Sequence, residues 1–436
     1  MLHRPWKMLL IAIAIIALLS GTAFSADPQS QSPLDRIVRE ALESNEDLKA
    51  AKARWQMFER KILPAGSLED PTLSLGLVNY PVDSFDDDVT PMTGKDIKIS
   101  QKFPFPGTLS AKSEMADQQA RWYKGVYEDS RLKVARKARE LYYQLFYLDR
   151  AEAVTEKNLN LLDDFIRLTQ TRYEVGKGLQ QDVLKAQVER SRLTDKLFSL
   201  QQQKLSTRAD LNALLARSES KTFDLPESLE LTQVEAEPEE LQELPQEHRP
   251  LFRAYTSLIG RYEAQKGLAR LDYRPDFTVW AGYRFRESSP MDPVDGDDFV
   301  SAGVTFNLPI YRKKLDETYA EAESGIAMAN RQYGEFRNRL QASIHDGYAK
   351  MERSRKQALL YETGIIPQAR QAFESTQSAY QVGKVDFLSV VDALMTLYRY
   401  EMEYYRALSV HEKSVARLEA EIGTSLPTDS LNDSLK

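Results

Sequence analysis

Residues 169–177 read TQTRYEVGK, and a near copy, TQSAYQVGK, stands at residues 376–384. The same offset continues downstream, where the matching pairs are Val183 with Val390 and Ala186 with Ala393. Each copy places a glycine directly after a long helical pattern, and glycine ends a helix readily because it adopts a positive φ at little cost. The repeat therefore predicts two helical hairpins built on one plan, with these segments as their turns.

A long helix is predicted before each turn. Residues 109–173 contain an apolar seam with alternating spacings of four and three, which is typical of a coiled coil: Val134, Ala138, Leu141, Leu145 and Leu148. Residues 314–380 form the second tract, with a weak point at Gly364 and Pro367 where we expect a kink. At 1.5 Å per residue each tract is roughly 100 Å long.

Shorter helices are predicted after the turns, at 179–215 and 386–422, and elsewhere at 33–61 and 247–271. The first two are each roughly 56 Å long and the other two roughly 38–44 Å. One long helix therefore matches two shorter helices stacked end to end. These lengths predict a cylinder of even height in which long helices alternate with stacked pairs.

Four segments alternate between apolar and polar residues with the period of a β-strand: 72–80, 95–103, 277–285 and 299–308. Their length of nine or ten residues fits a tilted membrane strand, although a half-buried soluble sheet shows the same alternation. Four strands cannot close a membrane barrel, because the smallest barrels have eight. A spanning barrel would therefore have to be shared by several chains.

The N-terminus has the order of a secretory signal. Arg4 and Lys7 precede an uncharged run at 8–20, and a small-x-small site follows at 23–25. The run is too short for a membrane anchor, which needs about 18–20 apolar residues. We therefore expect residues 1–25 to be removed and the mature chain to be exported.

The predicted organisation follows from these elements. After the signal peptide it consists of an N-terminal helix (26–61), a first repeat with its turn at 175–178 (62–217), an acidic linker (218–250), a second repeat with its turn at 382–385 (251–422) and a mobile tail (423–436). The fold class is mixed α and β, and the two halves interleave rather than form separate domains.

The amino-acid composition excludes several kinds of catalytic and metal-binding site. The chain has no cysteine and only four scattered histidines, which excludes disulfides, thiolate catalysis and iron–sulfur clusters and disfavours a histidine metal cage. Its net charge of −7 is unlike that of a nucleic-acid binder. Acidic loops at 83–94 and 288–298 lack the regular ligand spacing of an EF-hand. Phosphate-binding, nucleophile-elbow and zinc-protease motifs are absent, so we predict no enzyme, cofactor or metal site.

The duplicated plan and the two Y-x-V-G-K turns resemble the TolC-type outer-membrane efflux channels over nearly all of the mature chain. Further segments resemble the branch that serves heavy-metal efflux pumps of the cobalt–zinc–cadmium kind, within the RND class: Glu69-Asp70-Pro71, Asn79-Tyr80-Pro81, Met92-Thr93-Gly94-Lys95 and Phe103-Pro104-Phe105-Pro106-Gly107. The resemblance implies a homotrimer whose twelve strands form one transmembrane β-barrel in the outer membrane. The helices would continue it as a coiled-coil tunnel in the periplasm, joined by an adaptor (membrane fusion) protein to an inner-membrane pump.

The resemblance also assigns roles to residues. The adaptor-docking turns would be Val175-Gly176-Lys177 and Val382-Gly383-Lys384, although both glycines also have a purely structural reason. Asp182, Asp392 and Tyr380 would lie at the pore tip or gate, with the two aspartates alternatively serving only as helix caps or solvated side chains. Related channels can carry an arginine at the position of Val385 and an aspartate at that of Ser389, so the salt-bridged lock of those relatives is not expected here.

Two functions remain open from the sequence. The first is a passive exit duct for cargo delivered by a pump, and heavy-metal cations are one candidate cargo. The second is a soluble periplasmic coiled-coil scaffold or adaptor that bridges partners without spanning a membrane. The strand faces discriminate between them, because a channel needs an uninterrupted apolar outer face and a polar inner face.

Overall fold

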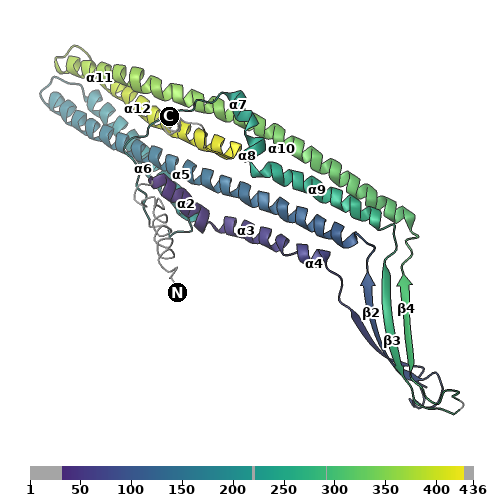
Figure 1. Ribbon diagram of the computed structural model, residues 1–436. Helices are drawn as coiled ribbons and strands as arrows, with labels where there is room; N and C mark the ends of the chain where they lie inside the picture. The colour runs from purple at the N-terminus through teal and green to yellow at the C-terminus, as the bar shows by residue number, and fades with distance from the viewer. Residues whose placement is uncertain (1–31, 219–220, 291, 427–436) are drawn as a thin grey trace, which may run out of the picture.

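The computed structural model describes residues 32–218, 221–290 and 292–426. The predicted signal peptide at 1–25 and residues 427–436 of the predicted tail lie outside these ranges. Figure 1 shows a long helical bundle with a four-stranded sheet at one end and two helical turns at the other. Within the described ranges, no helix combines the length and the apolarity that crossing a membrane requires.

The first half is built along one helix. Helix α5 (Thr108–Glu174) has 67 residues, within one residue of the predicted tract at each end, and α6 (Gln180–Leu214) returns beside it. The predicted coiled-coil seam is confirmed, because Ala138, Leu141, Leu145 and Leu148 are all buried and Val134 packs against them.

The prediction of one N-terminal helix at 26–61 is wrong for residues 32–61, while residues 26–31 lie outside the described ranges. The chain forms α2 (Pro33–Ser44), α3 (Glu46–Glu59) and the short α4 (Ile62–Gly66). Asn45 makes the first break, because its side-chain oxygen accepts a hydrogen bond from the Leu48 N–H at 2.9 Å and starts a new helix. Its amide also donates to the Leu214 carbonyl at 3.1 Å, which joins the end of α6 to the α2–α3 junction.

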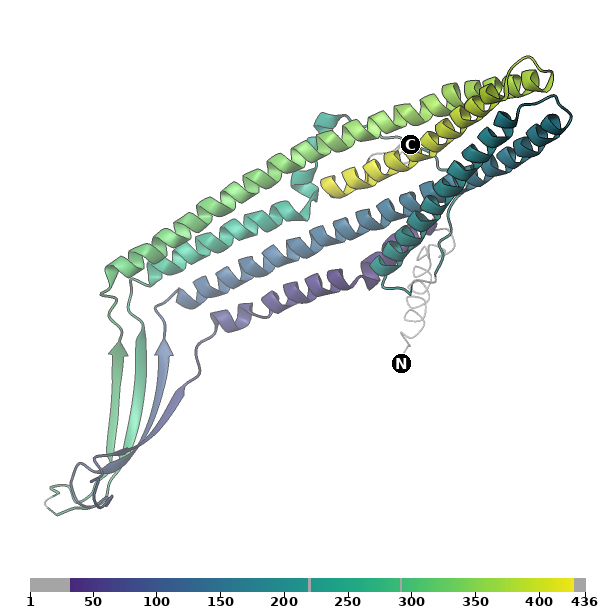
Figure 2. The ribbon, with the colours of Figure 1, turned by 180° about the vertical axis from the view of Figure 1, so that it is seen from behind.

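The second half follows the same plan (Figure 2). Helix α10 (Arg312–Leu360) continues through a π-helical turn, η2 (Tyr361–Ile365), into α11 (Ile366–Gln381), while α12 (Phe387–Ile422) and α9 (Pro250–Leu271) lie along it. The predicted weak point at Gly364 and Pro367 is therefore a π turn followed by proline in the first turn of α11. A π turn changes the hydrogen-bond ladder locally without breaking the helix.

A buried ion cluster joins the ends of α9 and α12. The Arg249 guanidinium lies 3.0 Å from Asp129 of α5 and 2.8 Å from Glu421 of α12. Beside it, Gly423 ends α12 at a φ of +91°, so close to the Arg249 backbone that a Cβ there would lie 2.9 Å away. The stacked pairs inferred from helix lengths thus meet at specific polar junctions.

Two segments are more ordered than the sequence indicated. The linker at 218–250 contains α7 (Pro238–Glu243) and α8 (Pro245–His248), and Leu241 is fully buried. Glu412 of α12 accepts hydrogen bonds from the backbone and hydroxyl of Thr232, both at 2.9 Å. The mobile tail predicted from residue 423 is wrong for residues 423–426, because Leu426 is only 2% exposed.

The strands β1 (Thr72–Val78), β2 (Gly94–Phe103), β3 (Phe277–Phe285) and β4 (Phe299–Phe306) form a sheet of that order, with all neighbours antiparallel. β3 has the predicted bounds, whereas β1 and β4 each end two residues early. Asn79 leaves the ladder at a φ of +57°, and the side chain of Asn307 caps the strand end by accepting from the Asp276 N–H at 2.5 Å. In Figure 2 the strands extend away from the helix ends.

Candidate functional site

The two predicted turns have the same backbone geometry. Gly176 and Gly383 adopt φ values of +69° and +74°. The following lysines donate their N–H back to Arg172 and Ala379 at 2.8 and 2.9 Å, and each glycine N–H bonds the carbonyl of the tyrosine three residues before it. This is the Schellman arrangement, which satisfies the last carbonyls of a helix and requires a left-handed residue. Both glycines therefore have the structural role of ending their helices in this arrangement.

Apolar side chains are exposed at these turns, at the end of the bundle opposite the sheet (Figure 1). Val175 is 61% exposed and Val382 70% exposed, and nothing lies within 4 Å of a Cβ built on either turn glycine. We call the two predicted docking turns, with the exposed Leu179 and Leu388 beside them, the tip surface. Exposed apolar side chains flanked by lysines suit contact with another protein.

Tyr380 lies between the hairpins and is 5% exposed. Its ring packs against Phe387, and the Arg172 guanidinium of the other hairpin lies 4.4 Å from the ring centroid. The same guanidinium donates to the carbonyls of Tyr380 and Gln381 at 3.1 and 3.0 Å. Arg172 therefore links the last turn of α5 to the last turn of α11.

The two predicted gate aspartates lie on different helices and differ in exposure. Asp182 is half-buried in the first turn of α6, where no side chain caps the helix, and Asp392 is exposed on α12. The cap of α12 is instead Asp386, which accepts bonds from the Ser389 N–H at 2.9 Å and its hydroxyl at 2.6 Å. These bonds, with the hydroxyl contributing most, lower the pKa of the Asp386 carboxyl. Neither Asp182 nor Asp392 acts as a cap.

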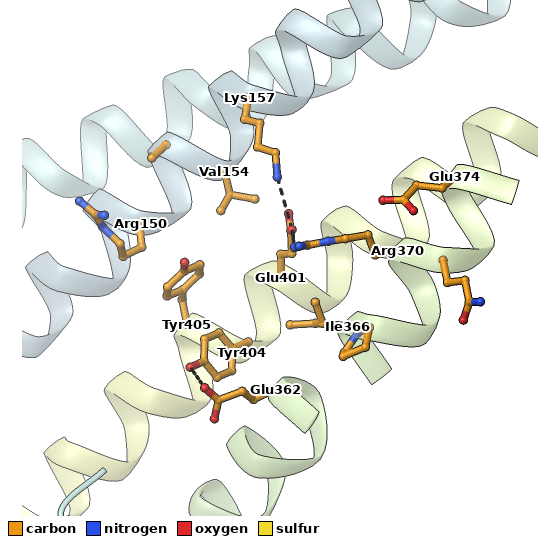
Figure 3. Close-up of a pocket in the computed structure, with 13 residues that line it drawn as sticks. Arg150, Val154, Lys157, Glu362, Ile366, Arg370, Glu374, Glu401, Tyr404 and Tyr405 are labelled. Carbon is orange, nitrogen blue, oxygen red and sulfur yellow. Dashed lines mark hydrogen bonds and ion pairs between the residues drawn. The ribbon is translucent and has the colours of Figure 1, made fainter. Parts of the chain in front are cut away.

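A second link between the hairpins lies beside the π turn (Figure 3). Glu401 of α12 is 7% exposed. It forms ion pairs with Lys157 of α5 at 3.6 Å and with Arg370 of α11 at 3.1 Å. These side chains line an open cavity of about 700 Å³. Tyr404 donates to Glu362 of η2 at 3.2 Å, and burial together with this carboxylate raises the pKa of Tyr404 to about 12.

The sheet has one apolar and one polar face. Along the register, one face of the strands carries apolar side chains with only Lys95 and Gln101 among them, both near strand ends: Leu73, Leu75, Leu77, Ile97, Ile99, Phe103, Phe277, Val279, Ala281, Tyr283, Phe285, Val300, Ala302, Val304 and Phe306. Many are strongly exposed, including Leu75 at 72% and Val300 at 76%. The opposite face contains the other charged residues of the strands, including an Asp96–Arg284 pair at 2.6 Å. A soluble scaffold would leave this apolar face in water, so the arrangement disfavours that alternative.

Neither Arg172 nor Glu401 was predicted from the sequence. The repeat itself contained the signal for Arg172, because the equivalent residue of the second copy is Ala379 and the two motifs otherwise differ little. Glu401 had no comparable signal, since its partners come from distant positions. In the ranges that the structure describes, no group of three histidine or acidic side chains is arranged to hold a metal ion.

The model of the family described as outer membrane efflux protein matches residues 37–217 and 242–424. The chain belongs to this family. Both matched ranges contain a strand pair, a long helix, a turn and a returning helix, and the family places the chain in the outer membrane as an efflux protein.

The individual relatives share only a small part of their sequence with this chain. The chain is 26% identical over 260 residues to the cobalt-zinc-cadmium resistance protein CzcC of Cupriavidus metallidurans, and the match spans 58% of each chain. It is 22% identical over 404 residues to the outer membrane efflux protein BepC of Brucella suis, which covers 87% of this chain and 83% of BepC. The structure resembles the CmeC outer membrane channel of Campylobacter jejuni with a TM-score of 0.77 and 14% identity, covering 95% of this chain and 93% of CmeC.

Proposed function

We propose that three copies of this chain close a twelve-stranded barrel in the outer membrane and continue it as a helical tunnel in the periplasm. The assembly is a passive exit duct for cargo that an inner-membrane pump delivers. The observation that carries this proposal is the two-faced sheet, whose exposed apolar face crosses all four strands. Lipid can cover that face, while the polar face lines water inside the barrel.

The tip surface is the adaptor-docking site in this proposal. It lies at the end of the bundle opposite the sheet, roughly 100 Å away by the length of α5. A duct needs its partner at the periplasmic end, and the exposed valines and lysines of the turns stand there. Asp182 and Asp392 lie one or two helical turns from the same end, where three copies could ring the pore.

The cargo is proposed from one relative. The name of CzcC refers to resistance to cobalt, zinc and cadmium, and the segments at 69–71, 79–81, 92–95 and 103–107 resemble that branch. Heavy-metal efflux through a pump of the RND class is therefore the function we favour for the complete system.

Membrane fractionation tests the class of protein. We expect the mature chain in the outer membrane, extractable only with detergent, with a protein mass of three chains after subtraction of bound detergent. Recovery from the periplasm as a monomer without detergent would overturn the proposal. Metal sensitivity of a deletion strain then tests the cargo, since unchanged tolerance to cobalt, zinc and cadmium would contradict the metal assignment alone.

A further inference from the structure

Among the described residues, the polar face of the sheet carries one charged side chain without an ion-pair partner. Its four charged residues within the strands are Asp96, Lys98, Lys102 and Arg284. Asp96 and Arg284 form a double hydrogen bond at 2.6 and 2.9 Å, and Lys102 lies 3.5 Å from Asp276. Among the described residues, no carboxylate lies within ion-pairing distance of Lys98. Its charge is therefore not neutralised locally.

Lys98 is held in place by an aromatic ring. Its ammonium lies 4.3 Å from the centroid of the Trp280 ring, a cation–π contact. The ring in turn lies over Gly303 of β4, because a Cβ built on this glycine would stand only 2.7 Å from it. The absence of a side chain at Gly303 makes room for the ring that supports the ammonium.

The residues beside Lys98 have small side chains. The register places Ser74, Gly282 and Ser301 in the same row across the other three strands. Lys98 is thus the one long side chain of its row, and nothing in that row shields its charge. Neighbouring strands are about 4.8 Å apart, so Ser301 lies about 10 Å from the Lys98 backbone across the empty position at Gly282.

Resting on the proposed trimeric barrel, we infer that Lys98 makes the middle of the barrel favour anionic over cationic solutes. Three copies supply three unpaired ammonium groups at one height, and the paired charges around them cancel. An unpaired charge on the wall of a water-filled passage attracts counter-ions and repels ions of its own sign over about a Debye length. A bare divalent cation therefore meets repulsion here, whereas a negatively charged solute or metal complex is attracted.

This local charge opposes that of the whole chain. The net charge is −7, and the acidic residues at 83–93, 288–290 and 292–298 lie beyond the strands. Carboxylates at the mouth act on a solute before or after it passes Lys98. The overall composition therefore does not predict the selectivity of the barrel interior.

The absence of native cysteine allows a direct test. Single cysteines are placed at Ser301, on the polar face, and at Ala302, on the apolar face, in the full-length channel in isolated outer membranes. Modification rates are measured with a sulfonate-bearing and a trimethylammonium-bearing methanethiosulfonate reagent, each relative to its rate with a free thiol. We expect the Ser301→Cys thiol to prefer the anionic reagent and the Ala302→Cys thiol to react with neither.

Substitutions at Lys98 then test whether this residue causes the anion preference. Adding Lys98→Gln should reduce the anion preference at Ser301→Cys by at least about twofold, while Lys98→Arg preserves it. Lys102→Gln is the matched control, because this lysine lies four residues further along β2, roughly 13 Å from the row that contains Ser301, and it should change the preference less. An unchanged ratio with Lys98→Gln, or a cation preference in the parent, overturns the inference. Equal labelling of Ala302→Cys and Ser301→Cys would instead overturn the barrel itself.

Discussion

Arg172 is the residue that connects the two hairpins at the tip. One guanidinium covers the Tyr380 ring and bonds two carbonyls at the end of α11. Charge-assisted bonds of this kind contribute about 1.5–3 kcal/mol each when they are sheltered, and less near solvent. The tip therefore relies on a contact in which the arginine stacks and donates, rather than on a salt bridge.

We predict that Arg172→Leu loosens the tip. Loss of both carbonyl bonds should raise the conductance of the reconstituted channel severalfold, measured in single-channel recordings. Arg167→Leu is the matched control, because among the residues that the structure describes Arg167 pairs only with Asp164 on its own helix. Equal conductance of the Arg172→Leu channel and the parent would contradict the assignment of Arg172 as a tip contact.

Lys413 makes stability depend on pH. Burial on α12 lowers the pKa of this lysine to about 8, although Glu140 nearby opposes the shift. Its ammonium donates to Gln144 of α5, and Lys137, Lys350 and Arg417 line the same cavity. Between about pH 8 and the ordinary pKa of 10.5, the unfolded chain binds a proton that the folded chain has released. This group therefore makes stability rise with pH in that window.

Replacing this lysine should remove that dependence. Below pH 8 the buried charge costs up to about 3 kcal/mol, so Lys413→Met is expected to raise the apparent melting temperature of the detergent-solubilised protein at pH 7 by several degrees. The variant should lose the further gain seen between pH 8 and 10 in the parent. Lys350→Met is the control, since Lys350 is exposed and paired with Asp346. A lower melting temperature for Lys413→Met at pH 7 would show that its contact with Gln144 outweighs the burial cost.

At the scale of an element, η2 accommodates an extra residue in the second long helix. A π turn closes i to i+5 hydrogen bonds, so it holds one residue more than the α-helical ladder around it. The helices on either side keep their apolar faces in register, because Ala358 before it and Phe373 after it are both buried. The sequence predicted a kink at Gly364 and Pro367, whereas the helix continues through these residues by way of η2.

Deletion of Thr363 should therefore be tolerated. Removal of one residue from the π turn converts it to α-helix and preserves the faces of α10 and α11, so we expect normal trimer yield by gel filtration of detergent extracts. Deletion of Arg353, which is also exposed but lies in regular α-helix, rotates everything downstream by about 100° and should abolish assembly. Equal loss of trimer in both deletions would refute the compensating role of η2.

For the whole molecule, the turns and the sheet are separated by the length of α5, so docking and membrane assembly can be disrupted independently. We predict that Gly383→Pro abolishes efflux in cells but leaves the outer-membrane trimer. Proline fixes φ near −65° and cannot adopt the +74° of this turn, so the Schellman cap is lost at an exposed site only. Gly383→Asn is the control, because asparagine tolerates positive φ and should retain most efflux. Full efflux with Gly383→Pro would refute the docking role of this turn.

Much of this architecture was predictable from local patterns. The heptad seam, the period-two strands and the Y-x-V-G-K turns each reflect spacing along a single element, and their bounds agreed within a few residues. The predictions that failed concerned single side chains, whose hydrogen bonds and burial do not follow from periodicity. Asn45 interrupted a helix by capping the next one, Asp386 rather than Asp392 was the cap of α12, and Leu426 was drawn into the core.

The repeat, the long helices and the strand faces were predictable from periodicity, because it encodes which side of an element meets water. The residues that join the hairpins depend on tertiary packing. Arg172 and Glu401 contact partners more than 200 residues away, and such pairings depend on how whole helices lie against each other. The pairing state of each charge on the polar face was settled in the same way. Register across strands neutralised Asp96 and Arg284 and left Lys98 unpaired, which spacing along one strand could not reveal.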